Sequence, residues 1–586
     1  MITMLRNLLK MSLVATLTLT MVGCQNQVEE YDASLNRDFT NFVDKIPSMI
    51  FEPDDQSVNQ LFINPEKAGI KPGLAEWQTY EYQALEDQEA LSQEIYEELM
   101  TYDVTLLSAE NKETFEVLEY AFSELPNEID TKTYFYLDNN PLGEYTGIYN
   151  NIIASFYFYS LRNELDIESY LNLLNTLDEF ALSLLEFEAE RQEAGYGMSR
   201  REIDNVLLML GEMLEDIDFS FIVDDFINDS SALENVEEEV IKAAQKEVSA
   251  IAEDQLINFF ETLKTGIEEI KPKYHEPKPI SQLAGGKEYF ANTVYSNSGF
   301  SDMDAYAAYL DLKLEESLTS YLSLLDEDLD LAKLYNGEIS LYEAESMNDV
   351  LDYLREAMAD DFPAIHDIEY IVEELPESMQ KLMPNIGAFY MVSAVDDLDA
   401  KQRIVLNGEY HPTDFITLAH EGYPGHMYQH IYANSLNLPL IRKILSFEDY
   451  AEGYANYVQR VSVKYTDNIE MAELYSAYES FLYYLILKVD YQVNYLNEDV
   501  SELFEEFFGT EKNDLKDDVL YQQVILAPGS FIEYYVAGSR IDDLYLEVFD
   551  LTDGQVTFKE FNESILKHGS VPINLLSEYV LEEYNN

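Results

Sequence analysis

The sequence has very few cysteines, few basic residues and no long apolar run after its first 24 residues. Its single cysteine, in a chain of 586 residues, excludes a disulfide framework and any cysteine-rich zinc or iron–sulfur site. Lys and Arg number 35 against 113 Asp and Glu, so the formal charge is −78 and the chain repels phosphate backbones. We therefore expect no nucleic-acid partner. Because no later stretch approaches about 18 uninterrupted apolar residues, we expect a soluble body.

Apolar residues are nonetheless abundant. They make up 47% of the chain and aromatic residues 13%, with 45 Tyr and 30 Phe. Acidic chains that are poor in apolar residues are usually disordered, whereas this composition is sufficient for a buried core. At roughly 100 to 200 residues per domain, the length allows several domains or one large two-lobed enzyme.

The N-terminal residues have the pattern of a secretory signal peptide. A basic start precedes a short apolar run that ends in small residues, and the run is too short for a transmembrane helix. Residues 21–24, Met-Val-Gly-Cys, resemble the lipobox of bacterial lipoproteins, in which the cysteine is lipidated. We therefore predict a signal peptide at 1–23, then a lipidated Cys24 and flexible spacer at 24–36. The protein would be held on the extracytoplasmic face of the cell membrane only by its lipid. The alternative is an ordinary signal peptide with an incidental cysteine.

Helical periodicity dominates the first half of the chain. Apolar residues recur at three and four positions, separated by Glu and Asp, at 87–101, 167–191 and 232–269. Each segment should form an amphipathic helix with an acidic outer face. We place these helices in an acidic N-terminal lobe at 37–271 and interpret its charge as solvated surface rather than as a binding site.

The composition changes at 271–287, where prolines alternate with lysines and two glycines follow. Because Pro and paired Gly interrupt helical patterns, we place the boundary with a second, catalytic lobe at 272–586. Helices resume over 303–375, and 385–410 is the segment most typical of short strands. The predicted fold is therefore mainly α and two-lobed, with at most a small β-sheet at a cleft.

Histidines are scarce but clustered. Four of the seven lie within residues 411–430, namely His411, His420, His426 and His430. Clusters of His with carboxylates are the usual components of a divalent-metal site. Pro412 suits the first position of a helix over 413–422, which would present His420 and Glu421 together.

The spacing of these histidines differs from the HExxH pattern, in which two His four apart share a helix face and bind zinc beside a general-base Glu. His420 and His426 are six apart, which corresponds to about 240° of net rotation on a straight helix. Pro424 and Gly425 permit a bulge that would bring the two imidazoles together. A competing pair is His426 and His430, which are four apart but enclose no carboxylate. We favour the first pair; the alternative to both is a set of hydrogen-bonded structural histidines.

A catalytic zinc site needs a third protein ligand and an open position for water. The next helical segment offers Glu448, Asp449 and Glu452. Glu452 precedes a glycine and is flanked by apolar and aromatic residues, so we expect it to point inward and prefer it as the third ligand.

The segment HEGYPGHMYQ, residues 420–429, resembles the HExxPGHxxQ signature of the bacterial family known as domain of unknown function 885. Further motifs of this family match in the same order, namely GGKEYF with a following Ser-Gly at 285–299, PNIGAFY at 384–390, AEGYANY at 451–457 and PGSFIEYYV at 528–536. The resemblance covers about 285–540. Tyr454 stands where the family has Trp, and Ala537 where it commonly has Gly.

Members of this family are often lipoproteins and are regarded as zinc metallopeptidases. The resemblance therefore implies a zincin-like catalytic region that binds one Zn²⁺, or another divalent metal, through His420, His426 and Glu452. It also implies that Glu421 is the general base.

The function predicted from these residues is hydrolysis of a peptide bond in a short peptide substrate. Glu421 would take a proton from water and return it to the leaving amine. Tyr534 and Tyr535 are candidates to stabilise the oxyanion, and Arg540 is a candidate to bind a substrate carboxylate. Two alternatives stay open: a non-catalytic surface lipoprotein that binds metal or a partner, and a metal hydrolase that acts on a non-peptide bond.

Overall fold

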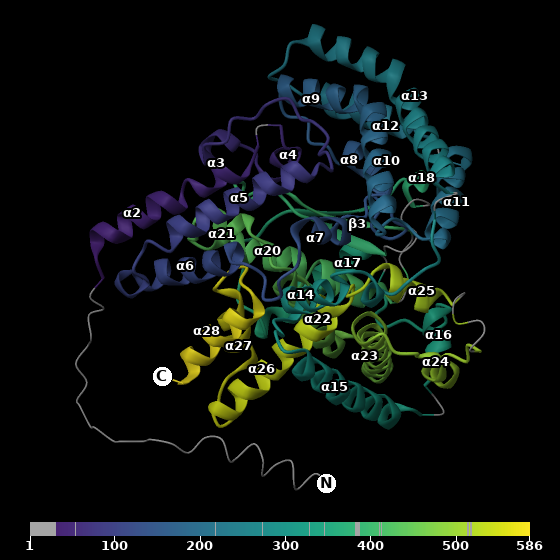
Figure 1. Cartoon of the computed structure of the whole chain (residues 1–586). Helices are drawn as coiled ribbons and strands as arrows, with labels where there is room; N and C mark the ends of the chain where they lie inside the picture. Colours follow the sequence, from purple (N-terminus) through teal and green to yellow (C-terminus); the bar gives the residue numbers. More distant parts are fainter. Residues whose placement is uncertain are drawn as a thin grey trace.

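The computed structural model describes residues 31–585 apart from 53, 217, 272–273, 327–328, 345, 381–386, 409–410, 412, 512–514 and 516–517. The predicted signal peptide and Cys24 lie outside these residues. Within them the chain is mainly helical, with one three-stranded sheet near the middle of the molecule (Figure 1). No helix in this part of the chain combines the length and apolar character needed to cross a membrane.

The first half of the chain folds into helices whose apolar faces pack together. Polar side chains start several of them; Asp130, for example, accepts a hydrogen bond from the Thr133 N–H at the start of α7. The helices are α2 (Ala33–Val43), α3 (Ile46–Ile50), α4 (Ser57–Leu61), α5 (Tyr82–Leu99), α6 (Ala109–Phe122), α7 (Thr131–Asp138), α8 (Ile152–Tyr157), α9 (Glu164–Asn175), α10 (Leu177–Ala194), α11 (Arg200–Asp216), α12 (Ser220–Ser231) and α13 (Glu238–Ile270).

Two of the three helices predicted in this half are confirmed, as α5 and α13. The third, predicted over 167–191, is two helices, because the chain leaves helical geometry at Thr176 between α9 and α10. The apolar spacing continues across this single residue, so the pattern could not reveal the break. The spacer predicted for 24–36 is too long, because α2 begins at Ala33 with Asp32 as its N-cap.

The second half contains the remaining helices. Most of 303–375 is helical as predicted, but Tyr370–Glu374 forms a strand, because pairing with a distant segment overrides its local pattern. The helices are α14 (Gly286–Ser298), α15 (Met303–Leu324), α16 (Leu331–Tyr335), α17 (Met347–Ala357), α18 (Glu377–Gln380), α19 (Asp414–Glu421), α20 (His426–Ser435), α21 (Leu440–Ile444), α22 (Glu448–Val461), α23 (Ile469–Asp490), α24 (Ser501–Phe507), α25 (Val519–Leu526), α26 (Ala537–Leu551), α27 (Phe558–Leu566) and α28 (Ile573–Asn585).

The sheet lies between the two halves of the chain. Its strands are β1 (Tyr370–Glu374), β2 (Ala388–Met391) and β3 (Gln402–Leu406), in the order β1-β3-β2. β3 pairs in parallel with β1 and antiparallel with β2, which confirms short strands within 385–410. Val405 packs into the core of the first half, whereas Ile404 and Leu406 pack into that of the second. The side chains of β3 thus alternate between two cores. The lobe boundary predicted at 271–272 stays a prediction.

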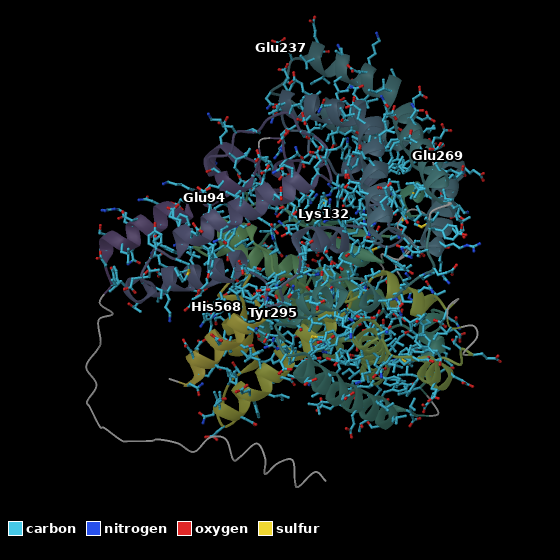
Figure 2. All side chains as sticks on the ribbon, in the orientation of Figure 1. Glu94, Lys132, Glu237, Glu269, Tyr295 and His568 are labelled. Carbon is cyan, nitrogen blue, oxygen red and sulfur yellow. The ribbon has the colours of Figure 1, made fainter. Side chains whose placement is uncertain are left out.

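Acidic side chains cover the outer helices. Figure 2 shows Glu269 of α13, and Glu237 just before this helix, at the periphery. Both are exposed, as is Glu94 of α5. The buried residues of α13 are all apolar. The excess of negative charge on these helices therefore lies in solvent, where its self-repulsion is weakest.

A buried ion cluster connects the two halves. The guanidinium of Arg442 on α21 lies 3.2 Å from the Glu113 carboxylate on α6 and donates to the His568 carbonyl at 2.7 Å. The Nδ1 atom of His568 lies 3.1 Å from the other oxygen of Glu113. Burial raises the pKa of Glu113, but His568 and Arg442 outweigh burial and lower it.

We expect Glu113→Gln to lower the free energy of unfolding by about 3 kcal/mol near neutral pH, because it leaves buried Arg442 without its counter-charge. The pKa of Glu113 is lower in the folded chain than in the unfolded chain. The difference in stability between the native and Glu113→Gln proteins is therefore complete at pH values above the pKa of Glu113 in the unfolded chain, and it is lost as the pH falls through the pKa of Glu113 in the folded chain. Urea unfolding at a series of pH values measures it, with the exposed Glu110→Gln as control. Equal stability of the native and Glu113→Gln proteins at neutral pH would contradict the prediction.

Candidate metal centre

The histidines predicted to bind metal flank a break between two helices. α19 ends at Glu421 and α20 begins at His426, so His420 and His426 do not share one straight helix. The helix predicted over 413–422 is confirmed as α19, while Pro412 lies outside the described residues.

The connection between these helices depends on Pro424 and Gly425. The peptide bond before Pro424 is cis, and the Tyr454 hydroxyl donates to the Pro424 carbonyl at 3.0 Å. A Cβ added at Gly425 would lie 1.7 Å from the carbonyl oxygen of His420. Only glycine therefore allows the chain to return so closely to the end of α19, as the bulge hypothesis predicts.

The break brings both imidazoles to one carboxylate. The Nε2 atoms of His420 and His426 each lie 3.4 Å from Oε2 of Glu452 on α22, and the two ring centroids are 4.8 Å apart. Within the described part of the chain, no other three His, Cys, Asp or Glu side chains place their ligand atoms this close together. Of the three carboxylates considered from the sequence, Glu452 is the one that contacts both histidines.

These three side chains fit a divalent cation. A tetrahedral zinc ion with bonds of about 2.1 Å separates its ligand atoms by about 3.4 Å. Oε2 of Glu452 lies at this distance from each Nε2, is buried, and has no hydrogen-bond partner among the described residues. A buried carboxylate oxygen without a partner is unfavourable unless a cation meets it.

The local charges favour a cation at the imidazoles. Burial raises the pKa of Glu452, but the two imidazoles outweigh burial and lower it to about 2. Burial lowers the pKa of His426, but Glu452 and Glu421 outweigh burial and raise it. The surroundings therefore stabilise positive charge at His426, whether a proton or a metal supplies it.

A chain of hydrogen bonds orients the first histidine. The Nδ1 atom of His420 lies 3.1 Å from Oε1 of Gln459, whose amide nitrogen donates to Glu479 at 2.8 Å. Because the Gln459 oxygen is an acceptor, it favours the tautomer with the proton on Nδ1, and Nε2 is then the nitrogen available to bind a metal beside Glu452. Sequence reasoning missed Gln459, although it follows Glu452 by two helical turns and so lies on the same face of α22.

We expect Gln459→Leu to weaken metal binding by about 10-fold to 100-fold, because the imidazole loses the acceptor that fixes its tautomer. Glu479→Gln should have a smaller effect, since its amide oxygen still accepts from Gln459. Competition with a chromophoric chelator measures both affinities. If Gln459→Leu binds metal as tightly as the native chain, this orienting role is wrong.

The predicted general base lies beside the sheet. Oε2 of Glu421 accepts a hydrogen bond from the backbone N–H of Tyr390 in β2 at 2.8 Å, and the Glu421 side chain is buried. A main-chain donor cannot be recognised from side-chain patterns, and this contact was not predicted.

The two predicted tyrosines differ in position. Tyr534 lies in the π-helical turn at 532–536, with its ring nearly parallel to that of His420 and 6.3 Å away. Burial and the nearby Glu452 raise the pKa of Tyr534, so its phenol stays protonated. Tyr535 stacks on Tyr483 at 4.1 Å and is buried in the core of the second half. Of the two, only Tyr534 lies beside one of the clustered histidines, His420.

The other sequence candidates lie outside the group of three. His430 lies 3.2 Å from the Ser393 hydroxyl and accepts from Asn434 at 2.8 Å, and burial lowers its pKa to about 4. Asp449 accepts from the Ile573 N–H at 2.9 Å. The competing pair of His426 and His430 therefore does not converge.

Arg540, the predicted anchor for a substrate carboxylate, donates to the Ser298 carbonyl and lies 5.4 Å from the Phe300 ring. It forms no ion pair with any described residue. Glu533, which sequence reasoning missed, accepts from Asn297 at 2.9 Å, and burial together with the charge of Glu452 raises its pKa to about 7. Glu533 and Glu479 are thus two carboxylates whose charges act on the centre and which the sequence did not suggest.

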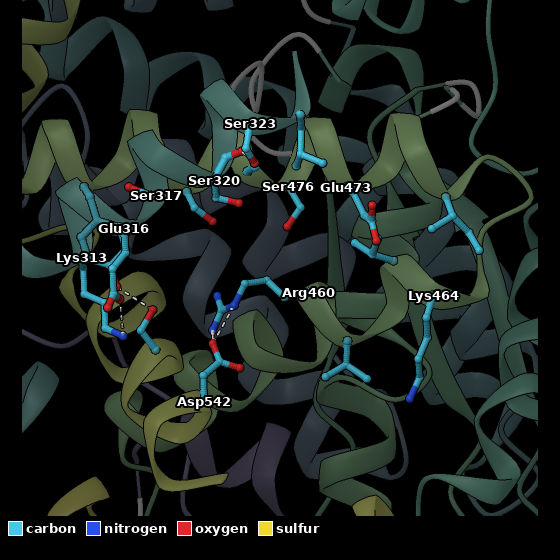
Figure 3. A pocket seen from close by; sticks show the side chains of 18 of the residues that line it. Lys313, Glu316, Ser317, Ser320, Ser323, Arg460, Lys464, Glu473, Ser476 and Asp542 are labelled. Carbon is cyan, nitrogen blue, oxygen red and sulfur yellow. Dashed lines mark hydrogen bonds and ion pairs between the residues drawn. The ribbon is translucent and has the colours of Figure 1, made fainter. Parts of the chain in front are cut away.

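A cavity of about 780 Å³ lies apart from this centre, between α15, α22, α23 and α26 (Figure 3). Its cationic side chains are all paired with carboxylates, as Figure 3 shows for Arg460 and Asp542, which are 2.6 Å apart. Neither the three clustered residues nor Glu421 and Tyr390 line it, so we assign it no part in the chemistry.

A family model described as "Bacterial protein of unknown function (DUF885)" matches residues 65–580. Two solved structures share the fold. "The putative lipoprotein from Colwellia psychrerythraea" has a TM-score of 0.75 and 16% identity, over 94% of this chain and 99% of that one. "A putative lipoprotein of unknown function from Shewanella oneidensis" has a TM-score of 0.56 and 13% identity, over 94% of this chain and 100% of that one. No curated protein matches the sequence.

Proposed function

Because the chain belongs to the bacterial DUF885 family, whose function that description leaves open, we propose that His420, His426 and Glu452 bind one zinc or similar divalent ion for the hydrolysis of peptide bonds. The observation that carries this proposal is the buried Oε2 of Glu452, which lacks a hydrogen-bond partner and lies 3.4 Å from both imidazole nitrogens. Glu421 favours catalysis over a structural site, since a structural site has no need of a carboxylate beside its ligand.

The residues around the centre have distinct roles in this proposal. A divalent ion held there would supply Lewis acidity toward a substrate carbonyl and lower the pKa of water. Glu421, held by the Tyr390 N–H, takes a proton from the attacking water and returns it to the leaving amine. Tyr534, protonated and beside His420, donates a hydrogen bond to the developing oxyanion.

We also propose that the protein acts outside the cytoplasm, on short peptides, while anchored by a lipid on Cys24. The lipobox-like residues 21–24 support this location, and both solved structures carry the description "putative lipoprotein". Labelling of cells with a fatty-acid analogue tests it: Cys24→Ser should abolish incorporation, and unchanged incorporation would contradict it.

A peptide library incubated with the purified chain tests the reaction. We expect cleavage that a chelator abolishes and added Zn²⁺ restores. Cleavage that survives complete metal removal would contradict metal dependence. Absence of peptide cleavage from a metal-loaded, folded chain would contradict the peptidase proposal.

A further inference from the structure

Strand β2 has an outer edge of which the proposed chemistry uses only the Tyr390 N–H, which holds Glu421. Among the described residues, β2 pairs only with β3. In an antiparallel ladder, every second residue of a strand bonds to the partner strand. The Asn407 N–H donates to the Gly387 carbonyl at 2.9 Å, so the alternate residues that bond to β3 are Phe389 and Met391. The backbone groups of Ala388 and Tyr390 must therefore point away from the sheet.

The bond between the Tyr390 N–H and Glu421 agrees with this alternation, because it also directs Tyr390 away from β3. Outside the ladder, the carbonyl of Tyr390 and both backbone groups of Ala388 have no backbone hydrogen-bond partner among the described residues. An edge with unpaired donors and acceptors is a template for another strand.

A groove of about 1010 Å³ runs along this strand, and residues 389–392 form one of its walls. The opposite wall comes from the first half of the chain and includes the aromatic side chains of Trp77 and Phe158. Its charged lining residues are all acidic, namely Glu52, Asp54, Asp55 and Glu76. All four are exposed, and none of them forms an ion pair with a described residue.

We propose that this groove binds the substrate as an extended peptide that adds a strand to β2 and carries basic and apolar side chains. Main-chain bonds to the two backbone groups of Ala388 and to the carbonyl of Tyr390 would give affinity, while the Tyr390 N–H stays bonded to Glu421. The acidic and aromatic lining would give selectivity. Tyr390 lines the groove and also contacts Glu421, so a strand paired there passes beside the metal centre. This inference rests on the proposed function only in calling the peptide a substrate.

The alternation of a β-ladder gives a specific test. The probe is the fluorescein-labelled hexapeptide Arg-Val-Phe-Lys-Ile-Thr, with its binding to the full chain measured by fluorescence anisotropy in the presence of a chelator, so that cleavage does not interfere. A series of probes carries one N-methyl group each, at successive peptide bonds. We expect N-methylation at alternate positions to weaken binding about 10-fold and at the intervening positions by less than about 3-fold.

Two further arms test the protein side of the groove. The N–H of Val392 faces the same way as that of Tyr390, so the ladder with β3 does not use it. Val392→Pro removes this N–H and should weaken binding of the probe. Val392→Ala keeps the N–H and is the matched control. A probe with Gln in place of Arg and Lys should bind more weakly to the native chain. Because this Gln-containing probe has no basic side chain, it should bind equally to the native chain and to a chain carrying Asp54→Asn and Glu76→Gln.

The outcomes separate this inference from the proposed function. Alternating sensitivity without any hydrolysis in the metal-loaded chain would support the groove and overturn the peptidase. Hydrolysis with equal sensitivity at all positions would overturn the groove and leave the peptidase intact. Failure of the probe to bind would also overturn the groove.

Discussion

Glu421→Gln is expected to lower kcat for peptide hydrolysis by about 1000-fold or more while metal binding is retained. The amide lacks the basicity to take a proton from water, and general-base groups typically contribute about 100-fold to 10,000-fold. Its oxygen can still accept the Tyr390 N–H, so the position of β2 should be preserved. The variant therefore separates proton transfer from structure.

The measurement compares initial rates at saturating peptide, together with bound metal per chain, for the native protein and the variant. Glu470→Gln, at an exposed position in the first turn of α23, is the matched control and should keep full activity. Undiminished hydrolysis by Glu421→Gln would show that another group is the base.

Gly425→Ala is expected to have a large structural effect for the addition of a single methyl group. The added Cβ would lie 1.7 Å from the His420 carbonyl oxygen and 2.5 Å from that of Ala419, both in the backbone of α19. Backbone atoms cannot move aside as a flexible side chain can, so the helix junction must open. We expect a loss of about 3 to 5 kcal/mol in the free energy of unfolding, and loss of the metal site.

Denaturant unfolding with and without Zn²⁺ measures this effect. The control is Gly211→Ala in the interior of α11, where the added Cβ would approach only the end of the Lys264 side chain, at 3.4 Å. Alanine there should leave stability unchanged or raise it slightly, because it favours the helix more than glycine does. A Gly425→Ala protein that is as stable as the native chain would contradict the junction described above.

Local chemistry explains which parts of the centre could be predicted. His420, Glu421 and His426 lie within one short segment. The conformational preferences of Pro424 and Gly425 themselves predict the bulge between the two histidines. Glu452 comes from a separate helix, so its spacing alone could not distinguish it from Glu448 and Asp449. The structure distinguishes them because only Glu452 approaches both rings.

The parts that escaped prediction depend on tertiary contacts. The bond from Tyr390 to Glu421 uses a backbone N–H, which every residue but proline has. Strand β1 was predicted as helix because its partner, β3, lies far along the chain. Glu533, whose charge interacts with that of Glu452, belongs to a π-helical turn, and the helical periodicity of the sequence does not indicate the geometry of such a turn.

Measurement of bound metal per chain tests the central claim most directly. The native chain and His430→Ala should each bind one equivalent of Zn²⁺, because His430 is hydrogen-bonded to Ser393 and Asn434 and lies outside the group of three. His426→Ala and Glu452→Ala should bind none tightly while retaining native circular dichroism. A native chain that binds no divalent metal, or a loss of metal in His430→Ala but not in Glu452→Ala, would contradict the account.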